Sequence, residues 1–190
     1  MKVTNSLKKK IFIALLAAGV GGQQAYVATD LTVNSEGFYT APYNDPVGIK
    51  TWCVGHAGKK GEVVKKQYTE DECVALFVED WVTHEYLLNS VVKVPYRSGW
   101  MQGALTDFTF NKGIGNVASS TLLKNLNNKN YDATCEQLSR WIYGKVNGVA
   151  TKLPGLVIRA SKQYQYCMGN EPADYKSMLQ QIGNTYDKAL

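Results

Sequence analysis

The sequence predicts an α+β protein with a small β-hairpin lobe, a larger helical lobe and a cleft between them. Residues 47–54 and 62–68 are typical of short strands flanking a glycine-rich turn at 55–61. Apolar side chains recur at helical spacing along most of the chain after Thr69. With 190 residues, 45% of them hydrophobic, the chain can bury a core in one domain or two small lobes.

The other elements follow in order. A short helix within 30–39 would end at Gly37, because glycine commonly follows a helix, and the prolines at 41–46 indicate a turn. Thr69 followed by Glu72 is a capping-box signature that starts a helix. Further helices are expected near residues 97–110, 119–126, 131–142 and 156–168, and residues 171–190 would form an appended helix or a loose tail.

The N-terminus predicts a membrane-directed segment ahead of this body. Lysines crowd the first ten residues, and a run of 19 uncharged residues follows from 11 to 29. A cleaved signal peptide, a permanent anchor and a weak anchor that can leave the membrane all fit this pattern. We favour the weak anchor, because glycines and glutamines interrupt the run. The expected parts are therefore residues 1–29, a catalytic domain at 30–170 and an extension at 171–190.

The charge distribution argues against a nucleic-acid-binding protein. The net charge is +5, but Lys2, Lys8, Lys9 and Lys10 supply four positive charges before the uncharged run. The rest of the chain is close to balance, whereas a nucleic-acid-binding domain carries its positive charge on the folded body. Lysines that remain in the cytoplasm would place the body across the membrane.

The four cysteines, at 53, 73, 135 and 167, indicate two disulfides in an exported protein. No cysteine or histidine spacing is typical of a metal site, so we expect no metal. Three pairings are possible. We favour the local pairing, Cys53–Cys73 with Cys135–Cys167.

Three polar residues near the predicted hairpin suit glycoside hydrolysis. Glu36 lies at a predicted helix end, Asp45 nine residues later on the turn, and Thr51 on a strand. Hydrolysis of a glycosidic bond needs an acid for the leaving oxygen and a second polar group that holds water or stabilises the developing cation. By spacing alone the signal is weak, since Glu36 could be a solvated helix end and Asp45 an ordinary turn residue.

The surrounding residues resemble the phage lysozyme (muramidase) family. The resemblance rests on Glu36-Gly37, Pro42-Tyr43-Asn44-Asp45, Gly48, Thr51-Trp52-Cys53-Val54-Gly55-His56, Ala104 to Asn111, Arg140-Trp141, Gly155-Leu156 and Arg159. It covers residues 35–167. The chain departs from the family pattern at Cys53, which replaces a glycine, and at Ala160 and Gln163, which replace an arginine and a glutamate.

The resemblance implies hydrolysis of the β-1,4 bond between N-acetylmuramic acid and N-acetylglucosamine in peptidoglycan, usually with inversion and without a cofactor. Glu36 would be the general acid, and Asp45 and Thr51 would position the water. His56 and Asp80 would form a structural ion pair. Trp52 and Asn111 are possible substrate contacts, although a core position is the favoured interpretation for Trp52 and a buried hydrogen-bonding role fits Asn111 equally well.

One hypothesis connects the uncharged N-terminal run to Glu36. Glu36 follows the uncharged run by seven residues, so the helix that presents it must be built largely from that run. This arrangement resembles the signal-anchor-release endolysins of phages. The resemblance implies a monomer that is first held at the host inner membrane with its body in the periplasm and is later released. The alternatives are a lytic transglycosylase, a non-catalytic wall-binding module and a membrane-active protein acting through its basic N-terminus.

Overall fold

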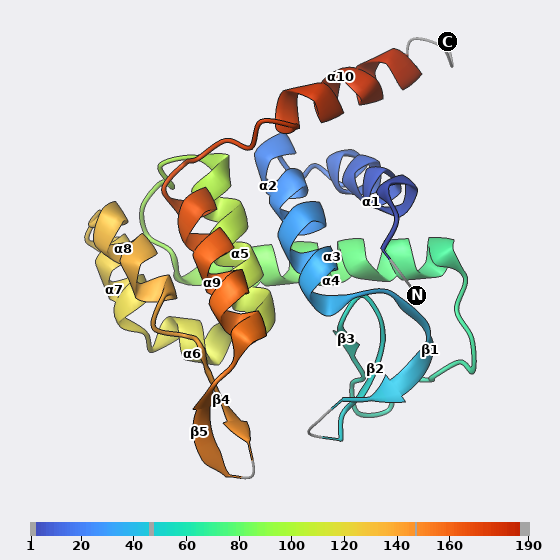
Figure 1. Cartoon of the computed structure of the whole chain (residues 1–190), viewed down its shortest axis with the longest axis horizontal. Coiled ribbons are helices and arrows are strands. Elements are labelled where there is room, and N and C mark those ends of the chain that lie inside the picture. The colour runs from blue at the N-terminus through green and yellow to red at the C-terminus, as the bar shows by residue number, and fades with distance from the viewer. Residues whose placement is uncertain (1–2, 46–47, 147, 187–190) are drawn as a thin grey trace.

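The computed structural model describes residues 3–45, 48–146 and 148–186. Its helices are α1 (Asn5–Ala17), α2 (Gly22–Val27), the π-helical turn η1 (Ala28–Thr32), α3 (Val33–Glu36), α4 (Glu70–Val91), α5 (Gly99–Lys112), α6 (Ile114–Ala118), α7 (Thr121–Asn127), α8 (Tyr131–Leu138), α9 (Pro154–Cys167) and α10 (Tyr175–Tyr186). Its strands are β1 (Tyr39–Asn44), β2 (Lys50–Cys53), β3 (His56–Ala57), β4 (Tyr143–Val146) and β5 (Val149–Lys152). Figure 1 shows two small sheets extending from a helical body, which confirms the α+β class.

The three-stranded sheet, in the order β1-β2-β3, corrects one turn prediction and one strand prediction. Residues 41–44 belong to β1 and not to a turn, since Pro42 is tolerated on an edge strand that needs no N–H there. No strand is described within residues 62–68; that segment is held by the Tyr68 N–H on the Thr40 carbonyl (2.8 Å) and by other local contacts. The strand predicted at 47–54 corresponds to β2, and its first residue, Val47, lies outside the described residues.

A second hairpin, β4–β5, was not predicted. The helix expected over 131–142 ends at Leu138, and the chain then enters β4. The dipeptide Asn147-Gly148, between these strands in the sequence, is a strong hairpin signal that could have predicted them.

The N-terminal segment is folded into the body. One face of α1 lies in the core through Leu7, Ile11, Phe12 and Leu15. The chain turns after Ala18, and α2, η1 and α3 then form one continuous helix from Gly22 to Glu36. The predicted boundary between residues 29 and 30 falls inside this helix. Within the described part of the chain, none of the helices combines the length and apolarity needed to cross a bilayer.

This continuous helix packs closely on α5. A side-chain carbon added at Gly103 would lie 3.0 Å from the Cβ of Val27, so the glycine allows the two helices to approach. Val27, Ala28 and Leu31 are almost completely buried. Burial of this face places the C-terminal end of the helix, with Glu36, against the body.

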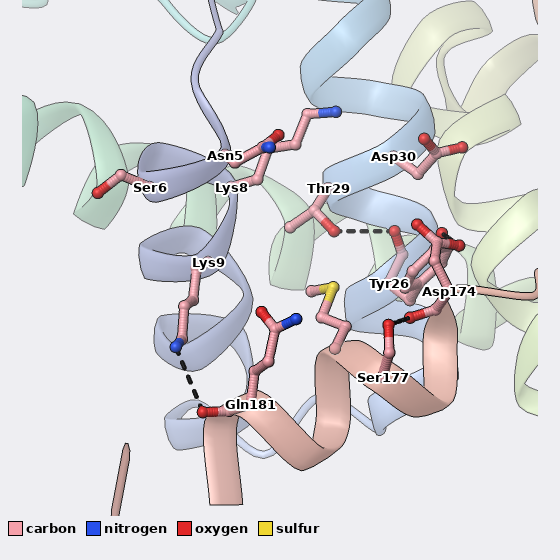
Figure 2. Close-up of a pocket in the computed structure, with 11 residues that line it drawn as sticks. Asn5, Ser6, Lys8, Lys9, Tyr26, Thr29, Asp30, Asp174, Ser177 and Gln181 are labelled. Carbon is pink, nitrogen blue, oxygen red and sulfur yellow. Dashed lines mark hydrogen bonds between the residues drawn. The ribbon is translucent and has the colours of Figure 1, made fainter. Parts of the chain in front are cut away.

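The C-terminal extension forms α10, which lies against the N-terminal helices (Figure 2). The ring of Tyr175 contacts that of Tyr26 edge to face at 5.4 Å between centroids. The Tyr26 hydroxyl donates to Asp174 Oδ1 (2.6 Å), and Lys9 Nζ donates to the Gln181 carbonyl (3.3 Å). A pocket of about 570 Å³ remains between α1, the continuous helix and α10. The extension is thus connected to the segment predicted to enter the membrane.

Candidate active site

Glu36 occupies the last position of the continuous helix. Gly37 ends the helix with φ +77°, a conformation that glycine adopts readily. Gly55 lies directly opposite, where an added side-chain carbon would come 2.9 Å from Glu36 Oε2. The Glu36 side chain is 23% exposed and lines a pocket of about 600 Å³ together with Asn111 and Arg159. A carboxyl in this position can meet a ligand while its other contacts hold it in place.

An ion-pair network supports Glu36 from inside the body. Arg159 Nη1 donates to Glu36 Oε1 at 2.6 Å. The same guanidinium contacts Asp107 through Nε (3.0 Å to Oδ2) and Nη2 (2.7 Å to Oδ1). Asp107 also accepts from the Thr32 hydroxyl (2.6 Å) and from Gln163 Nε2 (2.7 Å). The network therefore joins the acid-bearing helix to α5 and α9.

Electrostatics keep Arg159 charged although it is buried. Burial by itself would lower the pKa of Arg159, but the charges and hydrogen bonds of Asp107 and Glu36 outweigh it and raise the pKa. Sequence reasoning did not identify Asp107 and Thr32 as site residues, and it interpreted Gln163 only as the loss of a family glutamate. A glutamate there would bring a second carboxylate toward Asp107, whereas the amide of Gln163 donates to it.

Asp45 and Thr51 are brought together at the end of the hairpin. Asp45 Oδ1 accepts from the Ile49 N–H (2.8 Å), and the Thr51 hydroxyl donates to the Ile49 carbonyl (3.2 Å). Tyr43 pairs with Thr51 across the sheet. Its pKa is raised by burial and then by the negative charges of its surroundings, which include Glu36 and Asp45. Both predicted helpers thus bond the backbone of Ile49, Asp45 from the turn after β1 and Thr51 from β2, although neither lines the pocket beside Glu36.

The two predicted substrate contacts differ. Asn111, half-buried at the end of α5, lines the pocket beside Glu36. Trp52 is completely buried, with its ring stacked on Tyr68 at 5.6 Å and packed against His56. Trp52 therefore has the core position favoured from the sequence, and its buried ring offers no surface on which a sugar could stack.

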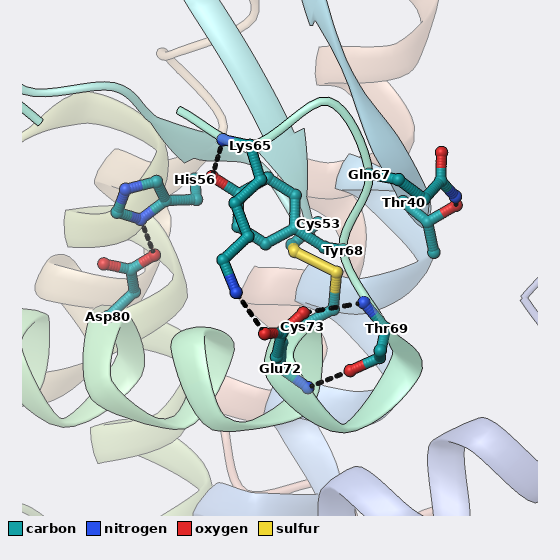
Figure 3. Close-up of a disulfide and its surroundings, with 10 residues drawn as sticks. All are labelled: Thr40, Cys53, His56, Lys65, Gln67, Tyr68, Thr69, Glu72, Cys73 and Asp80. Atoms are coloured by element: carbon teal, nitrogen blue, oxygen red, sulfur yellow. Dashed lines mark hydrogen bonds and ion pairs between the residues drawn. A yellow bond between two sulfur atoms is a disulfide. The ribbon is translucent and has the colours of Figure 1, made fainter. Parts of the chain in front are cut away.

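The predicted pair of His56 and Asp80 is present and anchors the sheet to α4 (Figure 3). His56 Nδ1 lies 2.6 Å from Asp80 Oδ2, and Nε2 lies 3.1 Å from Glu62 Oε1. Burial lowers the pKa of His56, but the two carboxylates outweigh it and the pKa is raised. The imidazole is buried and both ring nitrogens face carboxylates, so its contacts are structural.

Both disulfides of the favoured pairing are present. Cys53–Cys73 joins β2 to the start of α4, as Figure 3 shows, and Cys135–Cys167 joins α8 to the end of α9. The predicted capping box is also confirmed, since Thr69 and Glu72 exchange side-chain and backbone hydrogen bonds. Within residues 3–45, 48–146 and 148–186, no three His, Cys, Asp or Glu side chains converge as metal ligands would.

Comparison with known proteins identifies the family. A family model described as phage lysozyme matches residues 33–163. The chain belongs to the phage lysozyme family. It is 35% identical over 169 residues to a SAR-endolysin of Enterobacteria phage P21, which covers 86% of this chain and 96% of the relative. A SAR-endolysin of Bacteriophage PS119 is 38% identical over 133 residues, 70% of this chain and 76% of the relative.

Solved structures agree on the fold. The active form of the P1 phage endolysin Lyz matches with a TM-score of 0.69 and 21% identity, over 87% of this chain and 97% of that chain. The endolysin from Escherichia coli O157:H7 phage FAHEc1 gives a TM-score of 0.70 at 23% identity, over 80% and 94%. As a phage lysozyme, the protein is a peptidoglycan-lysing endolysin and a glycosidase of the muramidase type.

Proposed function

We propose that this endolysin hydrolyses the β-1,4 bond between N-acetylmuramic acid and N-acetylglucosamine, acting as a monomer without a cofactor. Glu36 donates the proton to the leaving oxygen, and Asp45 and Thr51 position the attacking water. The observation that carries the proposal is the partly exposed Glu36 carboxyl at a helix end, held by Arg159 beside a pocket of about 600 Å³. A general acid has to combine such access with a fixed position.

The role of Asp45 and Thr51 is supported by their common contact, the backbone of Ile49. Their bonds to the Ile49 backbone hold both side chains at one end of the hairpin. Tyr43, on the neighbouring strand, lies within the electrostatic reach of Glu36 and Asp45. An inverting enzyme needs space for a water between its two carboxyls, about 6.5–9.5 Å, so the water would attack from the face opposite Glu36.

Glu36→Gln tests the proposed acid. The amide has nearly the same shape and cannot donate the proton, so hydrolysis of purified sacculi should fall by roughly 10²–10⁴-fold. Glu136→Gln, an exposed position on α8, is the matched control and should keep full activity. Activity of Glu36→Gln within twofold of the parent would refute the assignment.

Product analysis tests the bond and the stereochemistry. Hydrolysis should leave a reducing N-acetylmuramic acid whose first detected anomer is α, as NMR during the reaction would show. A 1,6-anhydro end would instead identify a lytic transglycosylase. A reducing N-acetylglucosamine would show that the other glycosidic bond is cut.

We also propose that release of the N-terminal segment from the host inner membrane controls activity. While the body lies in the periplasm and residues 11–29 lie in lipid, the first half of the helix from Gly22 to Glu36 cannot pack on α5. The burial of Val27 and Ala28 in the folded body supports this, because those residues cannot be in both places. The SAR-endolysin relatives support it too.

Soluble peptidoglycan fragments allow a direct comparison of the two forms. Protein in sealed vesicles, with its body outside, should cleave the fragments much more slowly than protein released from the same vesicles. Equal rates would contradict control by release. The intact mass of the released protein, measured without reduction, distinguishes release of the whole chain from cleavage of a signal peptide.

A further inference from the structure

We propose that Asp107 is a positioning residue that makes the placement of Glu36 depend on docking of the helix from Gly22 to Glu36. The inference rests on the proposed role of Glu36 as the acid. It adds Asp107, on α5, as the residue that connects the docked helix to the Glu36 carboxyl.

Asp107 is completely buried, and all its hydrogen-bonding capacity is used. Oδ1 accepts from Thr32 and from Arg159 Nη2, while Oδ2 accepts from Arg159 Nε and from Gln163. A carboxylate offers about four such acceptor positions, and a buried one is costly unless they are filled. The site is therefore built for a carboxylate, and each of its donors is held in a defined place.

Asp107 determines where Arg159 contacts Glu36. An arginine side chain is long and flexible, but two parallel bonds to one carboxylate fix the plane of its guanidinium. With Nε and Nη2 bound to Asp107, Nη1 is directed to Glu36 Oε1 at 2.6 Å. Without the Asp107 contacts the guanidinium would be free to rotate, and the Glu36 carboxyl bonded to it would be displaced.

Thr32 connects the same carboxylate directly to the acid-bearing helix. It lies four residues before Glu36, about one turn away, and its hydroxyl donates to Asp107 at 2.6 Å. The last turn of the helix is therefore attached twice, once through Thr32 and once through Arg159 and Glu36. Both attachments require the helix to be docked on α5, so Asp107 favours the acid position only in the folded state.

Thr29 provides a matched control on the same helix. Like Thr32 it is buried, and its hydroxyl also makes hydrogen bonds, but to the helix's own carbonyls of Ala25 (3.1 Å) and Tyr26 (2.9 Å). Replacement of either threonine by valine removes a buried hydroxyl with little change in shape. Only Thr32→Val removes a contact to Asp107.

The test compares Thr32→Val, Thr32→Ser and Thr29→Val in the freed full-length protein with soluble peptidoglycan fragments. Loss of a hydrogen bond to a charged group should lower the kcat of Thr32→Val about tenfold, with KM within twofold. Thr32→Ser keeps the hydroxyl and should restore most of the lost kcat. Thr29→Val should keep kcat while losing a similar amount of thermal stability.

Three results would overturn the inference: a kcat for Thr32→Val within twofold of the parent, an equal loss in Thr29→Val, or no recovery in Thr32→Ser. Each would mean that the network only stabilises the fold. Glu36→Gln, measured in parallel, separates this failure from that of the proposed function. If Glu36→Gln is inactive while Thr32→Val is unaffected, the acid assignment stands and the proposed dependence of Glu36 on helix docking through Asp107 fails.

Discussion

Removal of the Tyr26 hydroxyl tests whether the C-terminal helix holds the N-terminal helices in place. The hydroxyl donates to Asp174 Oδ1 at 2.6 Å, and burial together with this bond raises the pKa of Tyr26, so the group remains a donor. A hydrogen bond to a charged partner contributes about 1.5–3 kcal/mol. Asp174 is exposed and regains water when the bond is lost, so we expect the lower end for Tyr26→Phe, about 1.5 kcal/mol.

A double-mutant cycle isolates this contact. Tyr26→Phe, Asp174→Ala and the double variant would be unfolded with guanidinium chloride, and the coupling energy should be about 1–2 kcal/mol. Hydrogen exchange should increase in α10 and α1 of each single variant. Tyr86→Phe, at an exposed position on α4, is the control and should change stability by less than about 0.5 kcal/mol. A coupling energy below about 0.3 kcal/mol would refute the reasoning.

Three further predictions concern the site's supports. Burial lowers the pKa of His56 less than Asp80 and Glu62 raise it, so the protonated His56 should stabilise the fold fully below about pH 6.5. This contribution to the free energy of unfolding should be lost as the pH rises through the raised pKa. Chemical unfolding from pH 5 to 9 measures the loss, and Asp80→Asn should make the free energy of unfolding less dependent on pH. Gly55→Ala should lower kcat by about tenfold to 10²-fold while the circular dichroism spectrum is retained, since its φ is +66° and the new carbon would displace Glu36, the proposed acid; unchanged kinetics would exclude that contact. Cys135→Ser should destabilise the protein by about 3–4 kcal/mol in guanidinium unfolding through loss of its disulfide, and an unchanged midpoint would show that the bridge is dispensable.

Local signals explain what the sequence could predict. The helix end at Gly37, the capping box at Thr69 and the local disulfides depend on residues close in the chain, and each is present. Pro42 favoured the prediction of a turn where β1 lies, because proline is typical of turns but also occurs on edge strands. The β4–β5 hairpin also has a local signal, the dipeptide Asn147-Gly148.

The support of the acid could not be predicted in this way. Asp107 contacts Thr32, 75 residues earlier, and Arg159, 52 residues later, so no spacing in the sequence indicates the cluster. Each residue, taken alone, is an ordinary polar position on a helix. Only the packing of α5 between the acid-bearing helix and α9 shows that these side chains share one buried carboxylate.

The composition of the N-terminal segment follows from the two environments that we propose for it. Glycines and glutamines weaken a membrane span, but in the folded body the same residues are useful. Gly19, with φ +86°, allows the turn between α1 and α2, and Gln24 Oε1 accepts from the Gly21 N–H (3.0 Å) at the start of α2. Gly22 leaves room for Tyr175, whose hydroxyl would lie 2.8 Å from an added side-chain carbon. The residues that would make the proposed anchor weak are thus the ones that let the segment fold on the body, so leucine substitutions that strengthen the anchor should also lower the activity of the released protein.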